Sequence, residues 1–137
     1  MLMSRFDLLA TLPAFLAYFA CALVLLALFL ALYTLVTPIE EWSEIRGGNA
    51  AAAVSLSGAL IGFALALGSV ITHSGGLLDM AVWGAIALVA QLATFFAVRV
   101  VKPDLVAQIG QRSMSHAIFV AGVSVAVGIL NAACMTN

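Results

Sequence analysis

The sequence predicts an all-α membrane protein in which four transmembrane helices form two tandem two-helix repeats. Three observations predict this fold: 8% of the 137 residues are charged, the mean hydropathy is +1.22, and four apolar windows can each cross a bilayer. So few charges cannot cover the surface of a soluble domain, because folding hides only about two thirds of a chain of this size. The outer surface is therefore expected to face lipid.

The four apolar windows are residues 14–35, 50–71, 77–98 and 117–135. At ~1.5 Å per residue, windows of about 19–22 residues span a hydrocarbon core of ~30 Å. A bilayer offers no hydrogen-bond partners to the backbone, so all four are expected to be helices. Arg5 before the first window is typical of a signal peptide, but the apolar run is too long and has no clear cleavage site, so we expect a retained helix.

The whole chain, residues 1–137, is expected to be one membrane domain with a first repeat at about 8–71 and a second at about 77–137. A shift of 66 residues aligns Arg46 with Arg112 and Gly62 with Gly128. Two spans per unit would give both repeats the same orientation, related by a pseudo-twofold axis along the membrane normal.

The first connection, TPIEEWSEIRGGN at residues 37–49, holds three of the six carboxylates in the chain. Thr37, Pro38 and Glu40 have the spacing of a capping box, and the Gly-Gly pair that follows Arg46 is a helix-ending signal. The segment is therefore predicted to be a short interfacial helix.

The few basic residues predict the orientation of the chain. Arg46, Arg99, Lys102 and Arg112 lie in the connections after the first and third windows, whereas only Arg5 lies on the opposite side. We therefore expect both connections in the cytoplasm and both termini in the periplasm.

Small residues recur every four positions in the second and fourth windows. They are Gly58, Gly62 and Ala66 in the second window, and Ser124, Gly128 and Ala132 in the fourth. Such spacing lets helix backbones approach closely, as it does in many membrane helix pairs. We interpret it as a dedicated packing seam, within the chain or between subunits of a homo-oligomer, rather than as general Gly/Ala richness.

The run GGNAAAAVSLSGALIGFALALGSVI, the following LLDMAVWGAIALVAQL and the ending AVGILNAACMTN resemble the YjfL family of small bacterial inner-membrane proteins over roughly residues 37–137. This family has a duplicated two-helix domain of unknown function, and its members are often encoded near proteins similar to phage-shock protein A. The resemblance implies the bacterial inner membrane and a role in the cell envelope, without an activity. The second repeat has SMSH where the first has GGNA, so a site there need not be symmetric.

No residue pattern indicates catalysis. His73 and Asp79 lie at the turn between the second and third windows, whereas His116 lies at the opposite face of the bilayer, so these groups cannot converge on a metal ion. No phosphate-binding loop, nucleophile with its base, or nucleic-acid surface is recognisable. We expect no enzyme activity, no cofactor, no metal and no nucleic-acid partner.

Two function classes remain. The favoured one is an oligomeric scaffold or partner in envelope maintenance, in which Glu40, Glu41 and Glu44 are either a solvated face or a docking patch for a basic membrane-associated protein. The alternative is a small oligomeric ion channel or transport subunit whose mouth those carboxylates make attractive to cations. Gln91 and Asn131 belong to two layers of intramembrane polar residues, interpreted as interhelical hydrogen bonds or as a pore lining.

Overall fold

The computed structural model of the protein describes residues 5–37 and 40–135, and every regular element in this part of the chain is a helix. The elements are α1 (Arg5–Val36), α2 (Glu41–Arg46), α3 (Ala50–His73), α4 (Leu77–Val101), α5 (Leu105–Gly110) and α6 (Met114–Cys134). Four of them, α1, α3, α4 and α6, are long and apolar enough to cross a membrane. The predicted all-α fold with four spanning helices is confirmed, whereas the internal repeat stays a prediction.

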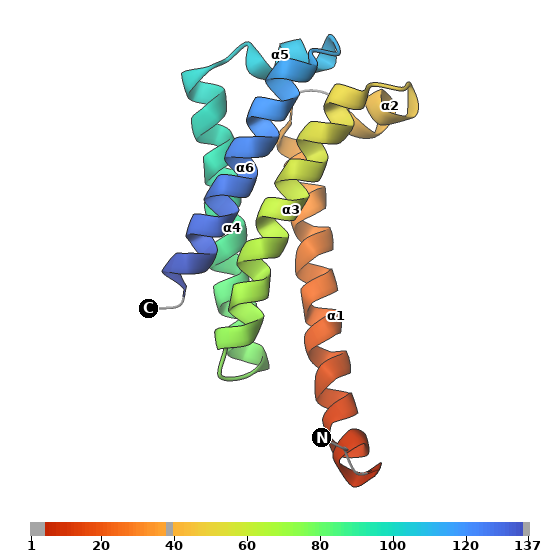
Figure 1. Cartoon of the computed structure of the whole chain (residues 1–137), viewed down its shortest axis with the longest axis vertical. Helices are drawn as coiled ribbons and strands as arrows, with labels where there is room; N and C mark the ends of the chain where they lie inside the picture. Colours follow the sequence, from red (N-terminus) through yellow and green to blue (C-terminus); the bar gives the residue numbers. More distant parts are fainter. Residues whose placement is uncertain (1–4, 38–39, 136–137) are drawn as a thin grey trace.

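The long helices form a bundle whose two ends differ (Figure 1). The short helices α2 and α5 lie together at one end, and the turn between α3 and α4 lies at the other. The N-terminal half of α1 continues past that turn, away from the other helices. The two short helices thus place both of the connections that were predicted to be cytoplasmic on the same side.

The closest packing in the bundle is between α3 and α6, which run side by side (Figure 1). There is no room for a Cβ atom at Gly58, which meets Ala121, or at Gly62, which meets the carbonyl group of Ser124. Gly128 in turn lies against the backbone of Gly62. Glycine is therefore required at the point where the two backbones touch.

The two remaining small residues, Ala66 and Ala132, lie toward the C-terminal ends of α3 and α6. Ala66 is fully buried, and Ala132 is half-buried. The carbonyl oxygen of Ala132 accepts a hydrogen bond of 2.9 Å from the Ser69 hydroxyl group. The structure thus brings Gly58, Gly62, Ser124, Gly128 and Ala132 to the contact between α3 and α6 within one chain, and it buries Ala66 in the core of the bundle.

Aromatic rings hold the C-terminal half of α1 against the bundle. The ring centroids of Phe29 and of Phe63 in α3 are 4.7 Å apart. Those of Tyr33 and of Phe95 in α4 are 4.8 Å apart. Aromatic pairs of this kind add about 0.5–1.5 kcal/mol beyond the area that they bury. Residues 9–17, by contrast, are all exposed.

The first connection begins differently from the capping-box prediction, which was wrong. Helix α2 begins after Glu40, which makes no side-chain capping hydrogen bond. The Thr37 hydroxyl donates instead to the carbonyl oxygen of Tyr33 at 2.7 Å and so satisfies the end of α1. The last carbonyl groups of a helix have no partner within it, so a hydrogen bond from Thr37 stabilises the end of α1. Pro38 lies outside the described residues.

Candidate functional site

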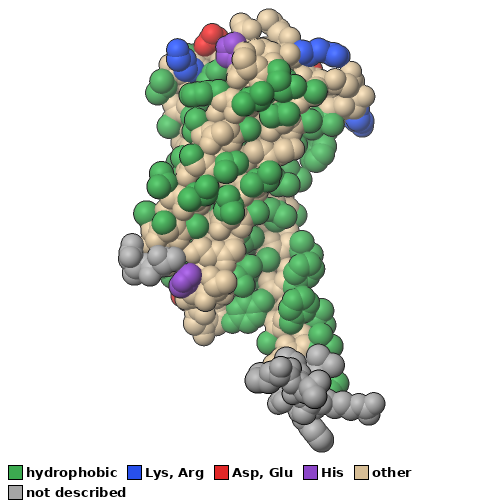
Figure 2. Space-filling view, in the orientation of Figure 1, with side chains coloured by type: hydrophobic (Ala, Val, Ile, Leu, Met, Phe, Trp, Pro, Cys, Tyr) green, Lys and Arg blue, Asp and Glu red, His purple; other side chains and the backbone are tan. Residues whose placement is uncertain are grey.

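Most of the charged side chains that the structure describes gather at the end formed by α2 and α5 (Figure 2). We define the elbow face as residues 40–49 and 102–113, which comprise the two short helices and their flanking turns. Glu40, Arg46, Asp104 and Arg112 are all exposed there. The surface of the elbow face therefore carries both signs of charge, above a belt of apolar side chains that covers the spanning helices (Figure 2).

Asn49 joins the two halves of the elbow face. Its side chain is 1% exposed, and its Oδ1 accepts a hydrogen bond of 3.2 Å from the backbone N–H of Ala52, so it caps the start of α3. Its Nδ2 donates to the carbonyl oxygen of Ile109 in α5 at 3.0 Å and to Oε2 of Glu44 in α2 at 2.9 Å. One buried amide thus connects α2, α3 and α5.

Arg112 makes a second link in the opposite direction. Its Nη2 donates a hydrogen bond of 3.0 Å to the carbonyl oxygen of Gly47, at the end of α2. Arg112 has a φ of 66°, which is uncommon for a residue with a side chain. Gly48 in the first connection has a φ of 85°, and each of the two residues stands two positions after the end of its short helix. Each short helix is therefore followed by a residue in the left-handed backbone conformation. The hydrogen bond of Arg112 joins the two helix ends.

The three glutamates of the first elbow do not share one surface. Glu40 is exposed, and Glu44 is half-buried and bonded to Asn49. Glu41 is only 3% exposed because it begins α2 on the side that faces the bundle. The structure therefore leaves Glu40 and Glu44, but not Glu41, available to a partner or an ion outside the protein.

Glu41 borders a small cavity beneath α2, with a volume of ≈ 10 Å³, about the space of one water molecule. Side chains from α1, α3, α4 and α5 complete its wall; among them are Tyr33, Thr37, Ser55, Phe95 and Ile109. Among the described residues, Oε2 of Glu41 has no hydrogen-bond partner. Burial raises the pKa of Glu41 to about 7, a larger effect than the opposing hydrogen bond of the Thr37 hydroxyl group.

The intramembrane polar residues make contacts between helices. Gln91 is 4% exposed, and its Nε2 donates to the carbonyl oxygen of Ser124 at 3.2 Å. Asn131 is half-buried and donates from Nδ2 to the carbonyl oxygen of Ala87 at 3.3 Å. Both are interhelical hydrogen bonds, the first of the two interpretations of these layers, and each joins α4 to α6.

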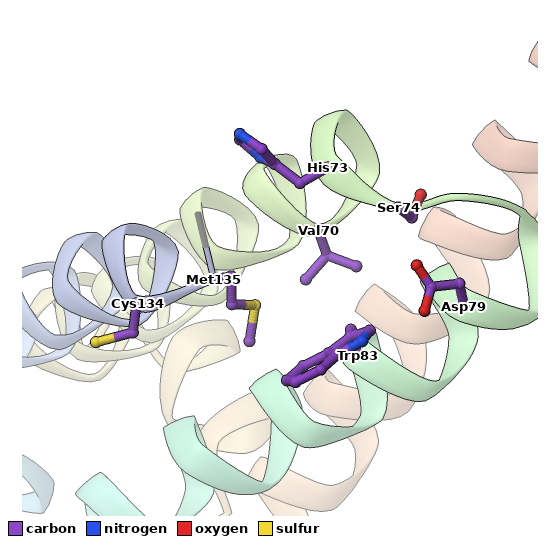
Figure 3. Close-up of a pocket in the computed structure, with 7 residues that line it drawn as sticks. All are labelled: Val70, His73, Ser74, Asp79, Trp83, Cys134 and Met135. Carbon is purple, nitrogen blue, oxygen red and sulfur yellow. The ribbon is translucent and has the colours of Figure 1, made fainter. Parts of the chain in front are cut away.

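A second hollow lies at the opposite end of the molecule, between the α3–α4 turn and the end of α6 (Figure 3). The His73 ring there is turned away from Asp79 (Figure 3). Asp79 accepts a hydrogen bond of 2.8 Å from the Gly75 N–H, so it serves the turn itself. Across residues 9–37 and 40–135, no three side chains of His, Cys, Asp or Glu converge in the manner of a metal site.

Sequence reasoning missed Asn49, Arg112 and the burial of Glu41. The position of Asn49, directly before an apolar run, is an N-cap signal that could have been used. No sequence signal identifies the contact of Arg112 with the first elbow, because its partner is 65 residues away. The burial of Glu41 likewise depends on contacts with four other helices.

Comparison with known proteins gives the chain a family. A family model described as "Domain of Unknown Function (DUF350)" matches residues 7–135. The UPF0719 inner membrane protein YjfL of Escherichia coli strain K12 is 38% identical over 126 residues, which cover 92% of this chain and 96% of that protein. The UPF0719 transmembrane protein YshE of Bacillus subtilis strain 168 is 34% identical over 87 residues, which cover 64% of this chain and 65% of that protein.

No solved structure matches the chain. Four apolar helices of spanning length and a family of membrane proteins agree in describing a multi-pass membrane protein. The resemblance noted in the sequence is confirmed, and the chain belongs to the DUF350 family.

Proposed function

We propose that this protein is a non-enzymatic scaffold of the bacterial inner membrane that engages a membrane-associated partner through its elbow face. The observation that carries the proposal is the link between α2 and α5 through Asn49 and Arg112, which makes two distant connections one surface. Trp42 adds a large side chain, 51% exposed, to that surface, and aromatic residues are enriched in protein interfaces. The relative named an inner membrane protein supports the location, and the YjfL resemblance supports a role in envelope maintenance.

The elbow face lies in the cytoplasm in this proposal, and both termini lie in the periplasm. Arg46, Arg99, Lys102 and Arg112 all belong to the elbow face or the last turn of α4, and cytoplasmic connections are rich in such residues. The turn between α3 and α4 at the other end has neither lysine nor arginine.

Self-association is part of the same proposal. An apolar groove follows the line between α3 and α6 on the lipid-facing side, with Ser57, Ile61, Gly122 and Ile129 in its wall. No atom lies within 4 Å of the place that a Cβ would take at Gly122, so the backbone of a second helix can approach there. A second copy of this chain is the occupant that we propose, and native mass spectrometry of the purified protein measures it.

A small oligomeric channel is the second candidate, and Gln91 is the observation in its favour. Its Oε1 is buried and has no hydrogen-bond partner within the described residues. Gly62 and Gly128 touch beside it, so α3 and α6 leave no passage between them at that level. A channel would therefore run between several copies of the chain.

We expect Glu40→Gln combined with Glu44→Gln to reduce recovery of the partner in affinity purification after in-cell cross-linking. Glutamine at position 44 still offers an oxygen to Asn49, so the fold should persist. Attraction between exposed charges is screened over ~8 Å at physiological salt, so wild-type recovery should also fall as salt rises. Quantitative mass spectrometry of the purified material measures both effects.

Asp79→Asn is the matched control, because Asp79 is an exposed carboxylate at the opposite end of the molecule. It should leave recovery unchanged. If the double variant retains its partners but loses conductance in reconstituted bilayers, the channel is the better account. Unchanged recovery and unchanged conductance would remove the functional role of both carboxylates.

A further inference from the structure

The first residue of α2 is ionisable, whereas the first residue of α5 is apolar. Glu41 is the first residue of α2, and Leu105 is the first residue of α5. Both are buried, with exposures of 3% and 5%. Leucine belongs in such a place, whereas a buried carboxyl group with an oxygen atom that has no hydrogen-bond partner, such as Oε2 of Glu41, is costly. The first elbow thus has an ionisable group where the second has a purely apolar one.

The surroundings of Glu41 disfavour its ionised form. Tyr33 from α1 is the other titratable side chain in the cavity wall, and it is neutral at physiological pH. Ser55 from α3 and Phe95 from α4 are uncharged, as are the two residues that α5 contributes, Val106 and Ile109.

The nearest basic candidate from α4 is engaged elsewhere. Arg99, one helical turn beyond Phe95, donates its Nη1 to the carbonyl oxygen of Val36 at 3.3 Å and is not part of the cavity wall. The cavity has space for about one water, so a hydration shell cannot form around a carboxylate. A negative charge on Glu41 would therefore have neither a cation nor a solvent shell.

Glu41 can reach water by a rotation of α2 that breaks two hydrogen bonds, one between Glu44 and Asn49 and one between Arg112 and Gly47. Helix α2 has only six residues, and both of its flanking neighbours at the start, Glu40 and Trp42, are exposed. Gly48 follows the helix with a φ of 85° and has no atom within 4 Å of its Cβ position, so the chain can turn there without a clash. Rotation of α2 would carry the carboxyl group from the cavity to the surface.

We propose that the cavity beneath α2 is a proton-binding site: protonated Glu41 holds α2 against the bundle, and deprotonation releases it. The raised pKa of about 7 supports this, since it places the transition in the physiological range. Because burial raises the pKa above its ordinary value, the docked form is fully favoured at acidic pH and is lost as pH rises through about 7. The inference stands whether or not the elbow face binds a partner.

The test follows Trp42, the neighbour of Glu41, in the full-length protein reconstituted into nanodiscs. Trp83 is the second of two tryptophans, so Trp83→Phe leaves Trp42 as the sole tryptophan in the sequence. We expect iodide quenching of Trp42 to change sigmoidally between pH 5 and pH 9 with a midpoint near 7. Glu41→Gln and Glu41→Leu should each abolish the change and keep the quenching of the acidic form.

Glu40→Gln is the control for a neighbouring exposed carboxyl group, and His116→Gln is the control for the histidine at the start of α6. Both should keep the transition. Infrared spectroscopy of the same samples should show a protonated-carboxyl band that disappears above pH 7 in the wild type and is absent from Glu41→Gln. A wild-type protein without a transition, or a transition that survives in Glu41→Gln, would overturn the proposal.

Discussion

Replacing Gly62 or Gly128 with isoleucine is expected to cause the largest loss of stability of any single change in the bundle. A side chain at Gly62 would meet the carbonyl group of Ser124, and one at Gly128 would meet the backbone of Gly62. Backbone atoms cannot rotate away as a side chain can, so α3 and α6 must separate. Overpacking a well-packed site costs about 1–3 kcal/mol, and separation of the central helix pair should cost more.

The measurement is the thermal unfolding midpoint in detergent, followed by circular dichroism. Gly68→Ile in α3 is the matched control, because no atom lies within 4 Å of the Cβ position at Gly68. The control should unfold close to the wild-type temperature, while Gly62→Ile and Gly128→Ile unfold far below it or fail to accumulate in membranes. Equal midpoints in all three variants would mean that α3 and α6 do not pack backbone to backbone.

Replacing Asn49 is expected to have the second largest effect, and the choice of substitute separates its two roles. Asn49→Ala removes the cap of α3, worth about 1 kcal/mol. It also removes one of the two hydrogen bonds that the Ile109 carbonyl oxygen accepts, worth about 0.5–1.5 kcal/mol, and leaves the bond from the Arg112 backbone N–H. Asn49→Asp keeps the acceptor for Ala52 but places a carboxylate against that carbonyl group and against Glu44.

Both Asn49 variants should therefore unfold at lower temperature, and Asn49→Asp should not rescue the loss. Asn131→Ala is the control, because Asn131 is a half-buried asparagine that donates one hydrogen bond, to Ala87. Interhelical hydrogen bonds in membranes average about 0.6 kcal/mol, so its effect should be small. If Asn49→Asp were as stable as wild type, capping alone would explain Asn49, and its link to α5 would contribute nothing.

Much of the fold could be predicted from the sequence, because the bilayer imposes a simple requirement on it. A window such as residues 50–71 has one stable conformation in lipid, since only a helix satisfies its backbone. The helix boundaries were less predictable. Helix α1 extends back to Arg5, well before the apolar window begins at residue 14, and it contains Pro13 in its interior, where proline removes a backbone hydrogen bond.

The small-residue spacing within each helix could not give the pairing of residues across the contact between α3 and α6. Gly58 meets Ala121 rather than Ser124, and Gly62 meets both Ser124 and Gly128. Which residues face each other depends on the crossing angle and the relative height of α3 and α6. Neither quantity is encoded in the spacing within a single helix.

The site was less predictable than the fold, since it depends on contacts between residues far apart in the chain. The Gly-Gly pair after Arg46 does predict where the short helix ends, but the side of α2 that faces inward depends on the helices packed against it. Once Thr37 completes α1, Glu41 becomes the first residue of α2 and faces the cavity. Charge alone would have placed Glu41 in water with Glu40 and Glu44.

Cysteine labelling in cells tests most directly whether α2 and α5 form one cytoplasmic surface. With Cys21 and Cys134 replaced by alanine, single cysteines are introduced by Ser43→Cys in α2, Gln111→Cys after α5 and Gly75→Cys in the α3–α4 turn, all at exposed positions. A membrane-impermeant maleimide applied to outer-membrane-permeabilised cells should label Gly75→Cys, and it should reach the other two only after lysis. Labelling of Ser43→Cys or Gln111→Cys in unlysed cells would contradict a shared cytoplasmic elbow face.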